Sequence, residues 1–507
     1  LVLFLDDLHW ADEGSLLLLN LLLTDPYGHY LLVVGSYRAD ALGDGHPLRQ
    51  TLEVLHKERV MTTTLALQPL QHADVCALLS DALSLPTAEV AELAAAVLAK
   101  TDGNPFFVGQ FLSALARDGL LYFSADNQRW EWTLSRITAL SATDNVADIM
   151  VAKLRQLSPQ TMSLLQTAAC VGTQFDLDIV AQLCELPESE RTDALAEAVR
   201  AGFLLSPSSS AYLGERTLPQ TSDAAAPPTS GDSGIVYKFL HERVQQAIYA
   251  SLDPVQRQDC HLRLGRLRLR QWGPDAPSGR LFDLVNHLNL GSSRMRDRGD
   301  TAELLALAAL NLSAGKRAKS TAAFHAAVGF FTAGTSLLPE SAWADHHDLM
   351  FELHLERAHG ESLSGAFADA EAQLAALGAR ARSAVERGLV CLRLCELYYA
   401  RADFAGATRV GIEGLTHVGM AVPAPEQAMP ALFAERAEIE RALAEGKTIA
   451  DLAQLPLNQS SEIDVTVRLI VALASPLYIA ESPLYPLLMA RQITLALRHG
   501  LSEQTSY

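Results

Sequence analysis

The first twelve residues read LVLFLDDLHWAD (residues 1–12), an apolar run that ends in two adjacent acids, Asp6 and Asp7. A short run that is apolar throughout is typical of a strand buried on both faces of a parallel sheet. The two acids then emerge at the carboxyl end of that strand. This stretch therefore predicts a parallel sheet with a pair of carboxylates at one edge.

The residues that follow continue this pattern. A leucine-rich helix is expected up to residue 23, with Ser15 as its N-cap, and a second apolar strand is expected over residues 30–34. Gly35-Ser36-Tyr37-Arg38 comes directly after that strand. Strand, helix and strand with short connections indicate a parallel α/β unit, in which ligands bind beyond the carboxyl ends of the strands. Asp6, Asp7 and Arg38 should therefore lie at one edge of the sheet.

The composition of the 507-residue chain excludes several function classes. Hydrophobic residues make up 49% and charged residues 20%, as in globular proteins, and the net charge is −19. No apolar run reaches the ~18 residues that a membrane helix needs. An acidic chain also disfavours an extended nucleic-acid surface, because phosphate binding needs clustered basic residues. We expect a cytoplasmic protein with no membrane partner and no direct nucleic-acid binding by this segment.

Cysteine and histidine spacing gives little indication of a metal site. The six cysteines lack zinc-site spacing, so reduced and buried thiols are expected. A histidine group could suggest a metal, but no acid or cysteine completes a defined geometry, and solvated helix residues are expected instead. Its members are His346, His347, His354 and His359.

Two further regions follow the α/β unit. Residues 69–145 have helical periodicity, with a helix stop at Gly103, a helix start at Pro105 and a hairpin over residues 120–134. Residues 146–250 contain helices up to residue 198, with breaks near residues 158 and 172, and then paired strands on either side of a Ser/Pro-rich insertion at 206–234. Loop-closure entropy grows slowly with length, so a hairpin tip tolerates a long insertion. These regions predict a helical lid and a winged-helix domain with a disordered insertion in its wing.

Residues 251–507 are almost entirely Ala/Leu-rich and are expected to be helical. Three segments look related, around Leu312–Leu338, Leu353–Leu377 and Leu392–Val418. Within the last two, Gly365-Ala366-Phe367-Ala368-Asp369-Ala370 and Ala402-Asp403-Phe404-Ala405-Gly406-Ala407 align 37 residues apart. Helix pairs near this period indicate stacked repeats, either tetratricopeptide-like or of a generic α-solenoid, through which protein partners would bind. The predicted fold class is α/β followed by all-α.

Residues 1–12 resemble the Walker B segment of STAND-type, AAA+-like signalling ATPases, a class of P-loop NTPase often found in bacterial regulators. The resemblance implies that Asp6 binds Mg²⁺ together with ATP or ADP, and that Asp7 is the catalytic residue that orients the nucleophile near the γ-phosphate. Residues 1–68 would then be the C-terminal part of the ATPase core, with a truncated parallel sheet. The alternative is an ordinary strand end with solvated acids.

Three further stretches resemble motifs of the same family, in the order that the family has them. Residues 33–40 resemble a strand whose terminal arginine senses the γ-phosphate, which gives Arg38 that role in place of an ordinary salt bridge. Residues 101–108 resemble a turn near the adenine, which makes Asn104 and Pro105 cofactor-binding residues and not just an ordinary helix start. Residues 239–247 resemble the end of the winged helix, where a histidine contacts ADP; His241 would do so, with a packed or capping histidine as the alternative.

The phosphate-binding pattern Gly-x4-Gly-Lys-Ser/Thr does not occur in the sequence. Gly446-Lys447-Thr448 and Gly315-Lys316-Arg317 are decoys, because Arg441 and Leu310 stand where the first glycine is required. In the family this loop precedes Walker B, so we expect the chain, which starts at Leu1, to be an N-terminally truncated fragment. Without the loop, the chain alone should bind ATP poorly and hydrolyse it negligibly.

The leading hypothesis is an ATP-dependent signalling switch within a bacterial multidomain regulator. ATP in place of ADP would release the winged-helix lid and reorganise the repeats. Proteins with such a middle section often carry a Ser/Thr kinase domain upstream and a histidine-kinase module downstream, so the resemblance implies a parent with ATPase and kinase activity. It leaves nucleotide-driven oligomerisation open. An ATP-dependent transcriptional activator and a non-catalytic helical-repeat scaffold are the alternatives.

Overall fold

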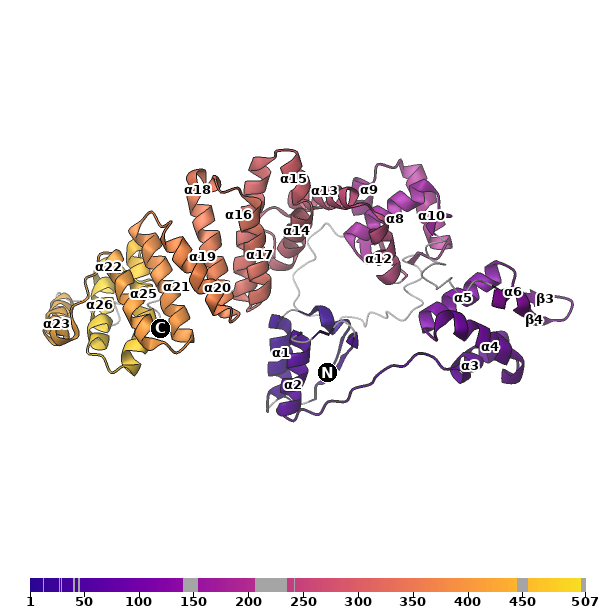
Figure 1. The fold of residues 1–507 in the computed structure, drawn as a ribbon, viewed down its shortest axis with the longest axis horizontal. Coiled ribbons are helices and arrows are strands. Elements are labelled where there is room, and N and C mark those ends of the chain that lie inside the picture. Colours follow the sequence, from indigo (N-terminus) through magenta and orange to yellow (C-terminus); the bar gives the residue numbers. More distant parts are fainter. Residues whose placement is uncertain are drawn as a thin grey trace. The chain divides into compact units, whose positions relative to one another are not determined.

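The computed structural model describes residues 1–11, 13–26, 28, 30–39, 42–43, 46–139, 154–205, 235–240, 242–444 and 455–502 (Figure 1). Over these residues the chain is mostly helical, with three small sheets. It divides into two compact units, Leu1–Val60 with Leu269–Tyr507, and Met61–Arg268.

Residues 1–60 form a parallel strand pair with two helices. The elements are β1 (Val2–Leu5), a 3-10 turn (Leu8–Trp10), α1 (Glu13–Thr24), β2 (Leu32–Gly35) and α2 (Pro47–Lys57). β1 and β2 are parallel, as predicted, with Leu5 opposite Gly35. Leu16 of α1 and Leu48 of α2 share one core cluster. The prediction of Ser15 as N-cap is wrong, because α1 begins two residues earlier, at Glu13, and Ser15 lies in its first turn.

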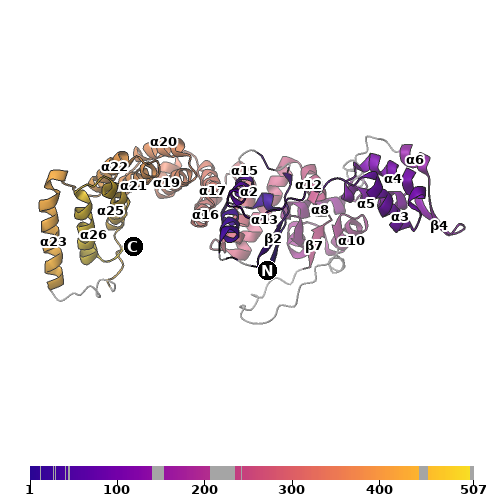
Figure 2. The ribbon, with the colours of Figure 1, turned by 90° about the horizontal axis from the view of Figure 1, so that it is seen from below.

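Residues 61–139 form a small helical domain with a hairpin. Its elements are α3 (His72–Leu83), α4 (Thr87–Thr101), α5 (Pro105–Arg117), β3 (Leu121–Ser124), β4 (Arg129–Trp132) and α6 (Leu134–Ala139). Val75, Leu93, Phe111 and Ile137 belong to its core. The antiparallel β3–β4 hairpin, which the sequence predicted, projects beyond these helices (Figures 1 and 2). None of the described helices could cross a membrane alone; α3 and α4 pass on length and composition only as a pair bent by 119°.

A second helical domain with a three-stranded antiparallel sheet follows. The elements are α8 (Pro159–Val171), β5 (Gln174–Asp176), α9 (Leu177–Leu183), α10 (Glu188–Arg200), β6 (Leu204–Leu205), β7 (Val236–Phe239), α12 (Glu242–Ser251) and α13 (Pro254–Trp272). The strand order is β5-β7-β6. β6 and β7 pair on either side of the insertion, as predicted, and the insertion at 206–234 lies outside the described residues.

β5 lies just after the helix break that was predicted near residue 172, but no strand was predicted there. This strand has three residues, too few to give an alternating pattern, and only Phe175 of the three is buried. The Phe175 ring packs on Phe239 of β7 with centroids 5.7 Å apart, so a single aromatic anchors the strand in the core. Residues 146–153 lie outside the described residues.

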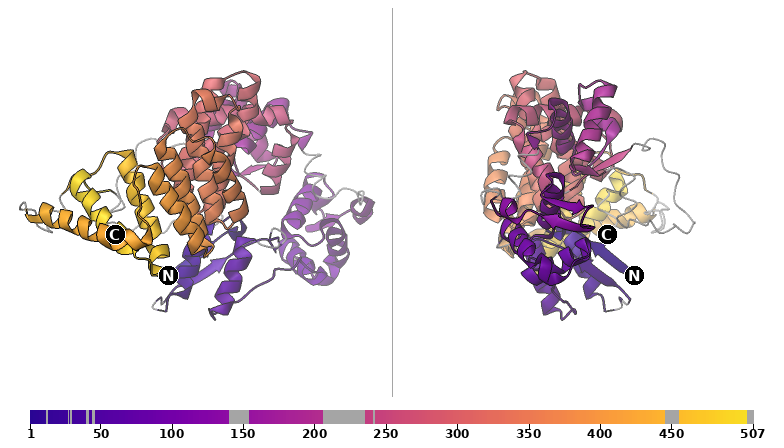
Figure 3. Two further views of the ribbon diagram at one scale, coloured as in Figure 1. Left: turned by 60° about the vertical axis from the view of Figure 1, so that its left-hand side comes forward. Right: turned by 90° about the vertical axis from the view of Figure 1, so that its right-hand side faces the viewer.

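Residues 278–499 form an array of stacked helices, which Figures 1 and 3 show side by side. The elements are α14 (Ser278–Leu290), α15 (Ser292–Asp297), α16 (Thr301–Ser320), α17 (Phe324–Leu337), α18 (Ala342–Asp345), α19 (His347–Leu363), α20 (Phe367–Gly378), α21 (Ala384–Ala400), α22 (Phe404–His417), a 3-10 turn (Pro425–Gln427), α23 (Ala428–Ala444), α25 (Ser461–Ile479) and α26 (Leu484–His499). Successive helices contact one another as antiparallel pairs, notably α16 with α17 and α21 with α22.

A short turn with positive φ joins the helices of each pair. The two segments that align in the sequence hold such turns, at Gly365 (φ 86°) and Ala402 (φ 58°). A third turn of this kind occurs at Ala322 (φ 60°), and in all three the next helix begins two residues later with phenylalanine. The three segments that look related in the sequence thus share the same turn geometry.

Glycines let the helices of the array approach closely. A Cβ atom at Gly315 of α16 would lie 2.3 Å from the ring of Phe331 in α17, closer than real contacts allow. Gly414 of α22 has the same role, since its Cβ would lie 2.7 Å from the Cβ of Cys391. Gly315 thus lies within helix α16 and serves packing, which agrees with the prediction that Gly315-Lys316-Arg317 is not a phosphate-binding loop. The similar stretch Gly446-Lys447-Thr448 lies outside the described residues.

Candidate functional site

The carboxyl ends of β1 and β2 bring an acid and a hydroxyl together. Because Leu5 lies opposite Gly35, the next residues of the two strands, Asp6 and Ser36, are neighbours at the same edge. The Ser36 hydroxyl donates a hydrogen bond to Asp6 Oδ1 and accepts one from the backbone N–H of Asp7 at 3.0 Å. Asp6, Asp7 and Ser36 therefore form one hydrogen-bonded cluster, here called the acid cluster.

An unusual backbone conformation presents the two acids separately. Asp7 has φ 54° and ψ 43°, in the left-handed region that aspartate tolerates better than most residues. The chain then turns into the 3-10 turn, and the N–H of Leu8 donates to the Ser36 carbonyl at 2.8 Å. A Cβ atom at Gly35 would lie 2.4 Å from Leu8 Cδ1, so a larger residue at position 35 would displace this turn. In a regular strand, successive side chains point to opposite faces of the sheet. The left-handed conformation of Asp7 ends this alternation, so the carboxylates of Asp6 and Asp7 do not follow it.

The acid cluster provides ligands suited to a hard cation. Asp6 and Asp7 are exposed, and a carboxylate oxygen is the ligand type that Mg²⁺ prefers. Ser36 holds one oxygen of Asp6 and leaves the other, Oδ2, for a ligand. The imidazole of His9 is buried, with Nδ1 at 3.9 Å from Asp7 Oδ1. Asp6 and Asp7 are therefore the residues at this edge that could hold a hydrated cation.

Arg38 follows β2 by three residues and is exposed. It therefore starts from the same sheet edge as the acid cluster, which is the backbone placement that the sequence predicted. Its role as a γ-phosphate sensor stays a prediction. Sequence reasoning assigns no role to Ser36, although a hydroxyl directly after a parallel strand stands where ligands bind.

Asn104 and Pro105 start helix α5 and are well explained by that role. The Asn104 side-chain oxygen accepts from the N–H groups of Phe106 at 3.1 Å and Phe107 at 3.3 Å, which is an N-cap, and Pro105 occupies the first helical position. This oxygen is therefore already engaged. Contact of either residue with adenine stays a prediction.

The turn before Asn104 requires glycine. Gly103 has φ 71°, and a Cβ atom there would lie 2.2 Å from the carbonyl oxygen of Leu70. The Leu70 N–H also donates to the Gly103 carbonyl at 2.8 Å. The turn is thus fastened to the segment that precedes α3. His241, the remaining predicted cofactor residue, lies outside the described residues.

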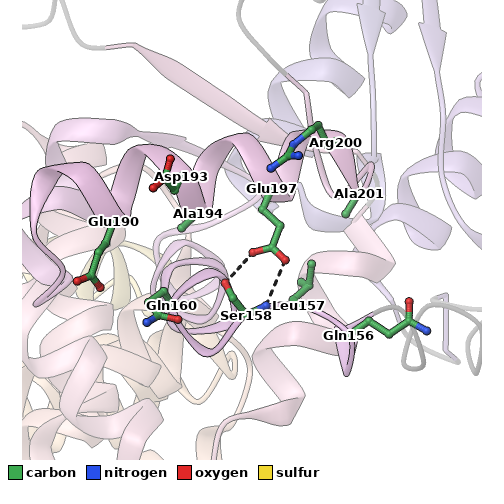
Figure 4. A pocket seen from close by; sticks show the side chains of 10 residues that line it. All are labelled: Gln156, Leu157, Ser158, Gln160, Glu190, Asp193, Ala194, Glu197, Arg200 and Ala201. Atoms are coloured by element: carbon green, nitrogen blue, oxygen red, sulfur yellow. Dashed lines mark hydrogen bonds between the residues drawn. The ribbon is translucent and has the colours of Figure 1, made fainter.

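The cavity in Figure 4 is unsuited to a nucleotide. It has a volume of about 590 Å³ and lies between the start of α8 and α10. Glu190, Asp193 and Glu197 line it, and their charges would repel a triphosphate. Glu197 accepts from the Ser158 N–H at 3.2 Å and from its hydroxyl at 2.6 Å, and hydrogen bonds from Ser158 and Thr161 hold the pKa of this carboxyl below its usual value. Glu197 thus has a structural role at the start of α8.

The expectation that the four histidines are solvated is wrong for three of them. His347 is buried and its Nε2 lies 2.8 Å from Glu386 Oε1. His354 stacks on Trp343 with ring centroids 5.3 Å apart, and burial, Arg357 and Arg380 lower its pKa. His359 contacts Lys319 Nζ at 3.2 Å. His347 is buried and His354 and His359 are half-buried, because α19 packs against helices on more than one side.

In the described part of the chain, no group of three or more His, Cys, Asp or Glu side chains is placed to hold an ion, so the acid cluster offers a cation only the carboxylates of Asp6 and Asp7. All six cysteines are free thiols, as predicted. Five of them are buried and Cys260 is half-buried.

Comparison with known proteins finds one curated relative. The chain is 26% identical over 428 residues to the "Hybrid signal transduction histidine kinase G" of Dictyostelium discoideum. The aligned region covers 77% of this chain and 12% of that protein. The chain thus matches only about an eighth of the length of its relative. No family model matches the chain.

Among solved structures, the chain is similar to a signal transduction ATPase with numerous domains (STAND) that has a tetratricopeptide repeat sensor, from Pyrococcus horikoshii. The sequence identity is 12% and the TM-score is 0.33, over 98% of this chain and 69% of that one. A superposition this loose carries no argument about a shared fold.

Proposed function

We propose that this chain is part of a nucleotide-dependent signalling switch. The observation that carries the proposal is the acid cluster, because it joins two carboxylates and a hydroxyl at the carboxyl edge of a parallel strand pair. Bound Mg²⁺ would neutralise charge on the phosphates of ATP. Asp6 would hold the hydrated ion, with Ser36 orienting it, and Asp7 would orient the attacking water. Arg38, Asn104, Pro105 and His241 would contact the nucleotide.

Exposed apolar side chains support the idea that the strand pair belongs to a larger sheet. Val2 is 68% exposed, Phe4 62% and Leu32 57%, all on the strand face that alternates with the half-buried Leu3 and Val33. On α1, Leu16 and Leu19 are buried, whereas an adjacent stripe of leucines is 48–60% exposed; these are Leu17, Leu18, Leu21 and Leu22. A contiguous apolar surface of this kind needs a cover in a stable protein. Further elements of an ATPase core would provide it.

A signalling role receives support from the relative in Dictyostelium discoideum, which is a signal transduction histidine kinase. We propose that the chain is the middle section of a multidomain regulator, in which nucleotide exchange changes the contacts of the helical array. The same relationship favours a kinase-linked regulator over a transcriptional activator.

Two measurements test the proposal. Isothermal titration calorimetry of residues 1–507 with Mg-ATP should give no micromolar binding, because the sequence has no phosphate loop. In the natural protein that contains residues 1–507, Asp7→Asn should lower ATP turnover at least about 100-fold while ATP binding stays within a few-fold. Asp126→Asn in the β3–β4 turn is the matched control and should change neither. Unchanged turnover in Asp7→Asn would refute the catalytic role of Asp7.

A further inference from the structure

The helical array contains a polar cavity between two neighbouring helices. Helices α21 and α25 lie side by side (Figure 1), and a cavity of about 480 Å³ opens between them. Arg393 and Glu396 line it from α21, and Arg468 and Ser475 line it from α25. It is separate from the acid cluster, and the argument below does not depend on nucleotide binding.

Arg468 is a weakly neutralised cation in this cavity. Its side chain is 27% exposed, and Nη1 lies 3.8 Å from Asp464 Oδ2, beyond hydrogen-bond distance. Within the part of the chain that the structure describes, its guanidinium makes no hydrogen bond, and Asp464 already accepts one from the Ser502 hydroxyl at 2.9 Å. A guanidinium offers five N–H donors in a planar fork, so those of Arg468 are available to a ligand.

Arg393 is buried in the same cavity and is incompletely satisfied. Its side chain is 9% exposed; Nη1 contacts Glu396 at 2.8 Å, and Nη2 lies 3.7 Å from Glu356. Its Nε–H is buried and has no hydrogen-bond partner among the described residues. A buried donor without a partner is unfavourable, so Arg393 would gain from a rearrangement that brings an acceptor to it.

The formal charges around the cavity cancel, but their pairing is uneven. Lys319 pairs with Glu356, and Arg393 pairs with Glu396. Arg468 then remains with only its loose contact to Asp464. Burial first, and then Arg393, Lys319 and Arg468, lower the pKa of the neighbouring His359 to about 2.

We propose that this cavity binds the carboxylate of an acidic ligand, with Arg468 as the main donor and Arg393 completing the site. The N–H donors of Arg468 and the buried Nε–H of Arg393 suit a singly charged carboxylate, whereas a phosphate dianion would bring a second negative charge next to Glu396. Val471 and Ala472 provide an apolar wall beside the two arginines, so the ligand carries an apolar group next to its carboxylate. A protein segment that contains Glu and Leu and a small aliphatic carboxylic acid both meet this description.

The test is isothermal titration calorimetry of the whole 507-residue chain with three probes. These are a blocked peptide of alternating glutamate and leucine, hexanoate, and inorganic phosphate. Saturable binding of the peptide or hexanoate is expected, weaker binding of phosphate is expected, and Arg468→Gln should lose about tenfold or more in affinity. Arg468→Lys should fall in between, because it keeps the charge and loses the fork. Tighter binding of the peptide would identify a protein segment as ligand, and tighter binding of hexanoate a small acid; either order upholds the site.

The matched control is Arg498→Gln on α26. Arg498 is 58% exposed and already pairs with Glu438 at 2.7 Å, so its loss should leave affinity unchanged. Circular dichroism with equal helicity and melting temperature would show that both variants fold. The proposal is overturned if neither carboxylate binds saturably, if Arg468→Gln binds like the wild type, or if phosphate binds more tightly than both carboxylates.

Discussion

The turn at Gly103 gives the sharpest stability prediction, because a methyl group there meets a backbone atom. In Gly103→Ala the new Cβ would lie 2.2 Å from the Leu70 carbonyl oxygen, and φ would stay at 71°, which suits few residues other than glycine. A backbone carbonyl cannot move to another rotamer as a side chain can, so Leu70 and the turn at Gly103 must move apart. The hydrogen bond from the Leu70 N–H to the Gly103 carbonyl, 2.8 Å in the native turn, should then break.

Three terms set the expected magnitude. The left-handed conformation costs alanine about 1 kcal/mol. The lost backbone hydrogen bond adds about 1 kcal/mol. Displacement of Asn104 from its capping position at Phe106 and Phe107 adds about another 1 kcal/mol. The local opening free energy should thus fall by about 3 kcal/mol, which corresponds to about 100-fold faster exchange.

Hydrogen exchange of single amides is the suitable assay, because a chain with several domains does not unfold in one step. The amides of Leu70 and Phe107 should exchange about 100-fold faster in Gly103→Ala. The matched control is Gly119→Ala, where φ is 65° and no heavy atom lies within 4 Å of the new Cβ, so only the conformational term of about 1 kcal/mol applies locally. Exchange at Leu70 within about threefold of the wild-type rate would refute the steric reasoning.

Three further predictions concern packing and titration. Gly315→Ala places a methyl 2.3 Å from a ring of α17 and should destabilise the array by about 1–3 kcal/mol, whereas Gly329→Ala, with open space at its Cβ, should not lower the melting temperature; equal melting curves would contradict this. His359 has a folded-state pKa of about 2 against an ordinary 6.5, so below pH 6.5 the unfolded chain binds more protons than the folded chain. The free energy of unfolding should therefore decrease as the pH is lowered, by about 2 kcal/mol between pH 6.5 and pH 5. In His359→Gln the melting temperature should decline visibly less over the same range. Burial raises the pKa of the Cys395 thiol to about 12, whereas a hydrogen bond with the Cys170 thiol lowers the pKa of the half-buried Cys260 thiol. Alkylation at pH 8 followed by peptide mass spectrometry should therefore find Cys260 modified before Cys395. Faster labelling of Cys395 would contradict the assignment.

Much of the fold could be predicted because its signals are local. The apolar run before Asp6 and the run before Gly35 gave the parallel strand pair, and Gly103 with Pro105 gave the boundary between α4 and α5. Such features depend on residues within one turn or strand. β5 could not be found in this way, because three residues carry no period and Phe175 is held by contacts with a strand some sixty residues later.

The candidate site could be predicted as a location but not as a geometry. The sequence placed Asp6 and Asp7 at a strand end, while the link through Ser36 depends on the register of β1 against β2. Burial of His347, which sequence reasoning placed in solvent, depends on the stacking of α19 against neighbouring helices. Contacts between elements distant in sequence decide both outcomes.

The most direct test of the central claim is the Mg²⁺ dependence of ATP binding in the natural protein that contains residues 1–507. Asp6→Asn removes one negative charge from the acid cluster and keeps its size, so the Mg²⁺ concentration for half-maximal binding should rise about tenfold or more. Asp126→Asn, at the exposed turn between β3 and β4, should leave it unchanged. Superimposable Mg²⁺ titrations of wild type and Asp6→Asn would contradict the assignment of this edge as a magnesium–nucleotide site.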